Sequence, residues 1–176
     1  MLDVRRCINL FPNMTSPPYK IGHGYDLHRL QPGGRLLLGS IEVSTDLSPI
    51  AHSDGDVVLH ALVDAILGAI GQGDIGELFP NTDPRWKNAP SQVFVQAAVA
   101  KLQTAGYAIA NVDVTILAER PKLKPFKPAI KSAVAQMLNL PPDRVNIKAG
   151  TNEGCDAIGR GEAIAADVVL LLQKSP

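Results

Sequence analysis

The nine residues from His52 to His60, HSDGDVVLH, decide how the rest of this chain is read. They combine two histidines, two aspartates and a serine with the start of an apolar run that continues to about Ile70. The run is long enough for a helix, and in a helix that begins near Asp56 the residues Asp56, His60 and Asp64 share one face. A buried polar side chain needs a partner, because leaving it unpaired costs free energy. A metal ion is one partner that would satisfy such a polar stripe.

A second polar cluster lies upstream in Ile21–His28, IGHGYDLH. On a strand, Asp26 and His28 point to the same side, because side chains alternate between the two faces. Together with His60 they would give three protein ligands and one open position, a pattern typical of catalytic rather than structural zinc. All four histidines of the chain lie in these two clusters. Taken singly, each histidine is better explained as an ordinary strand or core residue, but the joint arrangement favours a metal site.

The composition limits the classes of protein that this chain can represent. Its 176 residues suit a single domain with its own core. The 17 basic residues balance the 17 acidic ones, so the chain has no broad positive field for nucleic acid. Cys7 and Cys155 are too few for a disulfide framework and are expected to be free thiols in a reducing compartment. We therefore expect a cytoplasmic protein without a nucleic-acid partner.

The chain has no segment that predicts a membrane anchor. Its longest apolar run, Val57–Ile70, carries two polar residues and is shorter than a membrane span. Residues 1–19 contain no sustained apolar region, so we expect no secretory signal. Three prolines in this stretch favour a disordered extension before a single domain of residues 20–176. Two arginines leave organellar targeting open, but an aspartate and the scarcity of serine argue against a transit peptide.

Hydrophobic periodicity predicts five strands and three helices in the order ββααβαββ. The first two strands, 19–30 and 35–43, flank the turn Gln31–Gly34 and should form a hairpin. The first helix should be capped by Ser53 or Asp54 and should end at Gly71. The remaining elements are expected at 91–105 (helix), 107–118 (strand), 128–140 (helix), 145–149 (strand) and 162–173 (strand). Two successive helices do not suit a doubly wound sheet, so we expect an α+β fold with helices packed on one face of a mixed β-sheet.

Three loops carry residues that suit ligand binding. Residues 74–84 form a long, turn-rich segment, and long ordered loops are often functional. Residues 119–128 are basic and stiffened by three prolines, which suits a phosphorylated or heterocyclic ligand as well as a solvated surface. Residues 150–154 are glycine-rich and include Glu153, a hard oxygen ligand for Mg²⁺ bound with phosphates. Alone, this last segment is better explained as a flexible loop.

These segments together resemble one family, the 2-C-methyl-D-erythritol 2,4-cyclodiphosphate synthases of the non-mevalonate isoprenoid route. The resemblance runs in register from about Lys20 to the end of the chain, and the two histidine motifs are its most specific part. The matching segments are IGHGYDLH (21–28), AHSDGD (51–56) followed by HA (60–61), GDIG (73–76), LFP (78–80), NVDVT (111–115), PKL (121–123) and GRGEAIA (159–165).

The resemblance implies a reaction and an assembly. It implies conversion of 4-diphosphocytidyl-2-C-methyl-D-erythritol 2-phosphate to the 2,4-cyclodiphosphate with release of CMP, catalysed by a phosphorus-oxygen lyase. It implies a homotrimer with each active site between neighbouring subunits. The cytidine diphosphate substrate would be the main partner, and association with a cytidylyltransferase is left open.

The resemblance also assigns site residues. The implied metal ligands are Asp26, His28 and His60 for zinc or another divalent transition metal, and Glu153 for Mg²⁺ or Mn²⁺ bound with the substrate diphosphate. His52 and Thr151 would position and stabilise that diphosphate. Asp56 and the turn at 74–76 would bind the erythritol, and the loop 118–124 the cytosine and ribose. The implied substrate-binding set is Asp26, His28, His52, Ser53, Asp56, Asp74, Ile75, Gly76, Phe79, Pro80, Asn81, Thr82, Asp83, Ala118, Glu119, Arg120, Pro121, Lys122, Leu123, Lys124, Gly150, Thr151, Asn152, Glu153 and Arg160.

Three positions depart from the family pattern. Gly150 stands where a threonine is usual, Asn81 where an aspartate is usual, and Ala157 near the place of an aromatic residue. The first and third of these changes affect phosphate contacts and the central cavity of the trimer rather than the reaction class. Two other functions fit the residues alone: a zinc phosphohydrolase, which would release a linear product, and a non-catalytic zinc-stabilised interaction module, which would bind no nucleotide.

Overall fold

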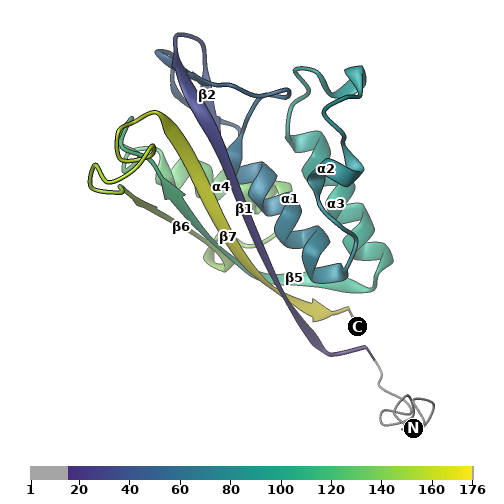
Figure 1. Ribbon diagram of the computed structural model, residues 1–176. Coiled ribbons are helices and arrows are strands. Elements are labelled where there is room, and N and C mark those ends of the chain that lie inside the picture. The colour runs from purple at the N-terminus through teal and green to yellow at the C-terminus, as the bar shows by residue number, and fades with distance from the viewer. Residues whose placement is uncertain (1–15, 176) are drawn as a thin grey trace, which may run out of the picture.

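A mixed β-sheet covered on one side by helices forms the body of the computed structural model, which describes residues 16–175 (Figure 1). The expected α+β class is confirmed. The elements in chain order are β1 (Tyr19–Pro32), β2 (Leu36–Leu38), β3 (Ile41–Ser44), β4 (Leu47–Pro49), α1 (Val57–Ile70), α2 (Ile75–Leu78), the 3₁₀ turn η2 (Pro84–Trp86), α3 (Gln92–Thr104), β5 (Tyr107–Leu117), α4 (Lys127–Met137), the 3₁₀ turn η3 (Pro142–Arg144), β6 (Val145–Gly150) and β7 (Ala163–Lys174).

The main sheet has the strand order β4-β1-β7-β5-β6, and β2 and β3 form a separate two-stranded ribbon. β5 and β6 run parallel, while β1, β4, β5 and β7 pair in antiparallel fashion. Side chains alternate along each strand, so one face of the sheet is apolar and is covered by α1, α3 and α4. The prediction that the helices pack on one face of a mixed sheet is correct.

Helix α1 lies directly on strand β1 because two glycines of the strand face it. A Cβ atom added at Gly22 would lie 2.0 Å from the carbonyl oxygen of Ala65, and one added at Gly24 would lie 2.0 Å from that of Ala61. Only glycine permits two backbones to approach so closely. This contact brings His60 beside Asp26 and His28, and so sets the position of the functional site.

The start of α1 differs from the prediction, because its cap is Asp56 rather than Ser53 or Asp54. The Asp56 carboxylate accepts hydrogen bonds from the N–H groups of Val58 (3.1 Å) and Leu59 (3.2 Å). It also accepts from the N–H groups of Gly39 (2.9 Å) and Ser40 (2.6 Å). One buried carboxylate thus joins the helix to the turn between β2 and β3. The end of α1 at Gly71, in the left-handed conformation with φ of 69°, is as predicted.

The predicted hairpin of strands 19–30 and 35–43 is wrong. β1 pairs along its length with β7 and at its end with β4. The second predicted strand is interrupted by Gly39 and Ser40, whose φ angles are 57° and 66°, so it folds back on itself as β2 and β3. The segment 44–51, expected to be a loop, contains β4, and the loop 74–84 contains α2 and the start of η2. The other predicted elements occur within a few residues of their expected bounds.

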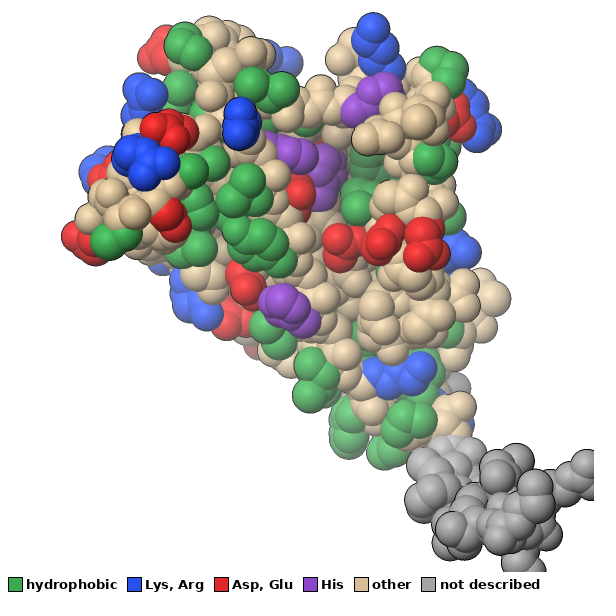
Figure 2. Space-filling view, viewed as in Figure 1, with side chains coloured by type: hydrophobic (Ala, Val, Ile, Leu, Met, Phe, Trp, Pro, Cys, Tyr) green, Lys and Arg blue, Asp and Glu red, His purple; other side chains and the backbone are tan. Residues whose placement is uncertain are grey.

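The second face of the main sheet carries exposed apolar side chains. Ile21 is 74% exposed, Tyr25 48%, Leu27 42% and Val169 43%, on the paired strands β1 and β7. Figure 2 shows these hydrophobic side chains gathered over the two strands. Tyr19, 60% exposed, lies at the start of the same strand.

Residues 1–15 and 176 lie outside the described part, and with them Cys7 and most of the predicted 1–19 extension. The Tyr107 hydroxyl donates to the Pro17 carbonyl oxygen (2.8 Å), and β1 begins at Tyr19, one residue before the predicted domain boundary. Within residues 16–175, Cys155 is free and exposed. No helix of this described range has the length and apolar character needed to cross a membrane.

Candidate metal centre and cleft

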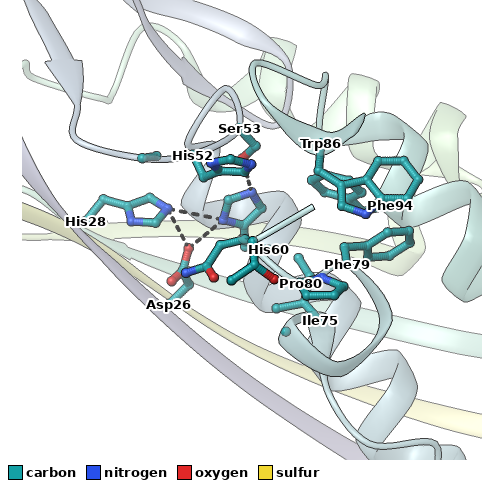
Figure 3. A pocket seen from close by; sticks show the side chains of 14 residues that line it. Asp26, His28, His52, Ser53, His60, Ile75, Phe79, Pro80, Trp86 and Phe94 are labelled. Carbon is teal, nitrogen blue, oxygen red and sulfur yellow. Dashed lines mark hydrogen bonds and ion pairs between the residues drawn. The ribbon is translucent and has the colours of Figure 1, made fainter. Parts of the chain in front are cut away.

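Three side chains from β1 and α1 converge on one point, as the motifs predict. The Nδ1 atom of His60 lies 2.9 Å from Oδ2 of Asp26, and Nε2 of His28 lies 3.2 Å from the same oxygen. The two ring nitrogens are 3.2 Å apart. Figure 3 shows both imidazoles turned toward the Asp26 carboxylate. The three side chains meet for two reasons. Strand alternation places Asp26 and His28 on one side of β1, and the contact between α1 and β1 brings His60 beside them.

The donor set and its spacing fit a divalent metal ion. Two imidazole nitrogens and a carboxylate oxygen are the ligands of many catalytic zinc sites. With metal–ligand distances of 2.0–2.1 Å, neighbouring donors of a tetrahedral site lie about 3.3 Å apart. The observed separations of 2.9–3.2 Å are close to that value. The site therefore needs little rearrangement to hold an ion.

The two histidines differ in their affinity for protons. Burial lowers the pKa of His60, but the hydrogen bond to Asp26 and the Asp26 charge outweigh this effect, so the net shift is upward. Burial also lowers the pKa of His28, and here the neighbouring Asp26 does not reverse the shift. In the absence of metal, a proton at this site is therefore bound by His60 rather than by His28.

The three side chains lie on the wall of a cleft of about 470 Å³. Its lining includes nine further residues of the predicted substrate-binding set or beside it: Ala51, His52, Ser53, Ile75, Gly76, Phe79, Pro80, Asn81 and Thr82. Figure 2 shows histidine side chains in a central hollow of the surface. The Nε2 atom of His52 lies 3.4 Å from the carbonyl oxygen of Asp83, which links the two loops that border the cleft.

Aromatic side chains close one side of the cleft. The rings of Phe79 and Phe94 lie 4.5 Å apart, and those of Phe79 and Trp86 lie 5.1 Å apart. Phe94 also lies 6.1 Å from the ring of His60. Sequence reasoning missed Trp86 and Phe94 as lining residues, and Phe94 falls inside the predicted helix 91–105. The available signal was that Trp86, the only tryptophan, lies two residues beyond the long loop 74–84 already singled out.

Three predicted substrate residues do not line this cleft. Asp56 is fully buried and its oxygens accept four backbone hydrogen bonds, so its placement does not support the predicted contact with substrate. Asp74 caps α2 by accepting from the N–H of Glu77 at 2.8 Å. Asp83 is paired with Arg85, whose hydrogen bonds lower the pKa of the Asp83 carboxyl.

Asp64, the last member of the predicted polar stripe, holds part of the cleft wall in place. Its Oδ1 accepts from the N–H of Ile75 at 2.7 Å. Burial raises the pKa of Asp64, and the Ile75 hydrogen bond opposes that shift. Asp64 therefore ties α1 to the turn that carries Ile75 and Gly76, which is a packing role and not a metal contact.

The remaining predicted site residues gather at a second cleft of about 360 Å³, at the carboxyl ends of β5 and β6. Its lining comprises Ala118, Pro121, Lys122, Leu123, Lys124, Lys127, Ala149, Gly150 and Thr151. Parallel strand ends are frequent ligand-binding places in α/β sheets. Glu153 lies beside this cleft, exposed, with its carboxylate accepting from the Thr151 hydroxyl at 3.0 Å.

The other predicted residues of this region make local contacts. Asn152 donates to Asp156 at 2.8 Å, and Arg160 forms a two-point ion pair with Glu162. Glu119 and Arg120 lie in the loop next to the lining residues, with a cis peptide bond between Arg120 and Pro121. The chain thus carries two separate clefts, and of the 25 predicted substrate-binding residues ten line the first and seven line the second.

A comparison with protein families decides the relationship of the chain. The model described as the YgbB family matches residues 19–173. The chain belongs to the YgbB family. This match covers every element from β1 to β7 except the last residue of β7, and it confirms the resemblance drawn from the motifs.

Named relatives are close to this chain in sequence and in fold. The chain is 47% identical to "2-C-methyl-D-erythritol 2,4-cyclodiphosphate synthase, chloroplastic" of Arabidopsis thaliana, over 98% of this chain and 75% of the relative. The "IspF (Plasmodium falciparum) CDP complex" has a TM-score of 0.82 and 31% identity, over 92% of this chain and 100% of that one. The bifunctional IspDF of Campylobacter jejuni has a TM-score of 0.85 and 42% identity, over 89% of this chain and 42% of that one.

Proposed function

We propose that this protein is a 2-C-methyl-D-erythritol 2,4-cyclodiphosphate synthase of the non-mevalonate isoprenoid pathway. It converts 4-diphosphocytidyl-2-C-methyl-D-erythritol 2-phosphate to the cyclic diphosphate and releases CMP. The observation that carries the proposal is the convergence of Asp26, His28 and His60 at a cleft, in a chain that is 47% identical to a synthase of that name over 98% of its length.

The reaction explains the kinds of residue present. The nucleophile is the 2-phosphate of the substrate, which is already anionic, so the protein needs no nucleophile and no general base. Divalent ions held by Asp26, His28 and His60 and by Glu153, which we take to be zinc and Mg²⁺ or Mn²⁺, would supply charge neutralisation at the diphosphate. The task of the chain is to align the attacking phosphate. Alignment is worth about 7–11 kcal/mol of barrier in favourable intramolecular reactions.

The lining of the first cleft suits the erythritol part of the substrate. Ile75 and Gly76 offer backbone groups on a turn held by Asp64, and the aromatic wall excludes water. His52 and Ser53 lie at the metal-site end, where they can contact the diphosphate. Asn81 and Thr82 add polar groups at the cleft, with Phe79 and Pro80 next to them.

The second cleft suits the cytidine part. Its backbone groups at 118–124 can pair with cytosine, and Lys122, Lys124 and Lys127 give it positive charge. Thr151 and Glu153 lie at its end, where the phosphates and the second ion would be bound. One substrate molecule must reach both clefts, and each chain carries them apart. We therefore propose a homotrimer in which the first cleft of one subunit meets the second cleft of its neighbour.

Two further points belong to this proposal. The predicted association with a cytidylyltransferase stays a proposal, and the existence of a bifunctional relative, IspDF, supports it.

The proposed location is the cytoplasm, with organellar targeting as the alternative. Relatives named as chloroplastic support that alternative. A fluorescent protein fused behind residues 1–19 would separate the two locations.

Incubation with the diphosphocytidyl substrate and Mg²⁺, followed by phosphorus NMR, tests the reaction. We expect CMP and a cyclic diphosphate in equal amounts. Release of CMP with a linear product would show a phosphohydrolase instead. Binding of zinc without any turnover or nucleotide binding would indicate the non-catalytic module.

A further inference from the structure

The imidazole of His60 is held from the side opposite the metal site by two serine hydroxyls. Its Nε2 atom lies 2.9 Å from Oγ of Ser91 and 3.0 Å from Oγ of Ser53. Ser91 is fully buried and immediately precedes α3, whereas Ser53 lines the cleft. Figure 3 shows His60 between the Asp26 carboxylate and the segment that carries His52 and Ser53.

Ser91 does not do what a serine at the start of a helix usually does. Such a serine accepts a hydrogen bond from an N–H group of the first turn. Ser91 makes no side-chain capping bond. Its hydroxyl instead donates to Oδ1 of Asp54 and faces His60, while its own N–H donates to Oδ2 of Asp54 at 2.8 Å. A local rule broken in this way is expected where a residue serves function.

The chain of contacts determines which ring nitrogen carries the proton. An ionised carboxylate only accepts hydrogen bonds, so the Ser91 hydroxyl donates to Asp54 and turns a lone pair toward His60. His60 then donates from Nε2–H to Ser91, so Nδ1 is the nitrogen that gives up its proton when a metal ion replaces the hydrogen bond to Asp26. The lone pair left on Nδ1 faces Asp26 and His28, where a metal ion would need it.

Ser53 is less suited to this task. Its Oγ accepts from the N–H of Gly55 at 3.3 Å, and among residues 16–175 no carboxylate is hydrogen-bonded to it. Asp54, by contrast, is itself anchored, because its N–H donates to the Ala89 carbonyl oxygen at 3.2 Å and its Oδ1 accepts from the N–H of Asp56 at 3.2 Å. The buried Ser91 and the partly buried Asp54 together are thus the rigid support of the ring.

We propose that Asp54 and Ser91 are positioning residues that fix the orientation and the Nδ1-free tautomer of His60 for a divalent metal ion bound with Asp26 and His28. The inference rests on the metal site of the proposed function and adds two residues that contact neither the ion nor the substrate. Outer partners of metal-binding histidines typically change metal affinity by about 10- to 100-fold.

The test compares Ser91→Ala with two matched serine or threonine variants in the full chain. Ser53→Ala removes the other hydroxyl beside Nε2. Thr104→Ala removes a hydroxyl at the far end of α3, where Thr104 donates to the Ala100 carbonyl oxygen. The dissociation constant of Zn²⁺ is measured by competition with a chromophoric chelator, and the visible spectrum of the Co²⁺ form reports on ligand geometry. We expect Ser91→Ala to weaken Zn²⁺ binding by about 10- to 100-fold and to alter the Co²⁺ spectrum. Thr104→Ala should match the unchanged protein, and Ser53→Ala should fall between them.

A second variant keeps the test decisive if Ser91→Ala folds poorly. Asp54→Asn keeps the size of the side chain and removes the charge that orients the Ser91 hydroxyl, so Zn²⁺ binding should weaken in the same direction. In the double variant the two effects should not add, because both residues act through one hydrogen bond to His60. Zn²⁺ affinity and Co²⁺ spectra equal to those of the unchanged protein in both single variants would overturn the inference, as would weakening by Ser53→Ala alone.

The result can be separated from the proposed reaction. If the unchanged protein binds Zn²⁺ and responds to Ser91→Ala but forms no cyclic product, the proposed function fails and the positioning role stands. If it forms the product and its Zn²⁺ affinity is insensitive to both variants, the positioning role fails alone.

Discussion

At the scale of single residues, histidines of the same strand or cluster have different surroundings and should respond differently to replacement. His23 and His28 lie on opposite faces of β1, and only His28 reaches the carboxylate of Asp26 and the ring of His60. His23 instead lies on the open face of the sheet, 3.2 Å from Asp167. Replacing a histidine on the cleft face of β1 should therefore lower the metal content, whereas replacing the histidine on the open face should not.

His60→Ala removes the helix ligand, and we expect the purified variant to lose stoichiometric zinc and nearly all turnover. His23→Ala, on the same strand as two ligands but on its other face, serves as the control and should keep full metal content. Elemental analysis of both purified proteins measures the difference. Stoichiometric zinc in His60→Ala would mean that the ligand set is wrong.

The affinity for zinc should rise with pH because protons compete for the same nitrogen atoms. The raised pKa of His60 means that the metal-free protein keeps this proton to higher pH than an ordinary histidine does. Below that pKa, binding of Zn²⁺ must displace the proton, so affinity should fall by about one decade per pH unit and level off above it. His28, with its lowered pKa, adds competition only in more acidic solution. Chelator competition between about pH 5.5 and 8 tests this, and a flat profile would contradict it.

At the scale of elements, the contact of α1 with β1 decides both stability and the site. Gly24→Ala would place a methyl group against the Ala61 carbonyl oxygen, and that backbone cannot yield without moving the helix. We expect the free energy of unfolding to fall by about 3 kcal/mol or more, which is the upper end of the range for overpacked cores. Gly68→Ala, in the same helix with nothing within 4 Å, should instead stabilise by about 0.5–1 kcal/mol. Urea unfolding of the metal-free proteins compares them, and equal stabilities would refute the role of Gly24.

The tie between α1 and α2 can be tested in the same way. Asp64→Ala leaves the N–H of Ile75 without its acceptor, so the turn that carries Ile75 and Gly76 should loosen. A hydrogen bond to a charged acceptor is worth about 1.5–3 kcal/mol, and we expect KM for the substrate to rise about tenfold with unchanged zinc content. A loss of zinc with unchanged KM would instead give Asp64 a role at the metal.

The sequence predicted those elements whose signals are local. Helix α1, its end at Gly71, and the strands β5, β6 and β7 follow from periodicity and glycine stops. The partner of β1 could not be predicted, because β7 lies far away in sequence and the turn at 31–34 favoured the nearer strand. Ser91 is the first residue of the predicted helix 91–105, and no sequence pattern shows that its hydroxyl bonds to Asp54 and His60. The ligand triad was predictable because alternation and helical spacing define it, whereas Trp86 and Phe94 joined the cleft through tertiary folding.

At the scale of the whole molecule, the two clefts of one chain predict complementation between defective subunits. His60→Ala damages the first cleft, and Glu153→Gln damages the second, where we expect it to raise the Mg²⁺ requirement. If each active site joins clefts from two subunits, an equal mixture unfolded and refolded together has intact pairs at about one site in four. Activity should return to about a quarter of that of the unchanged protein, as followed by CMP release. An inactive mixture would place the whole site within one chain.

Strand β1 has a further consequence for how the sequence can change. Its even-numbered residues from Gly22 to His28 face α1 and the cleft, and its odd-numbered residues from Ile21 to Leu27 face the open side. Deleting one residue ahead of Asp26 would exchange the two sets, burying Ile21 or Tyr25 against the helix and sending the metal-site side chains outward. Natural variants of this strand should therefore differ by substitution and not by insertion or deletion.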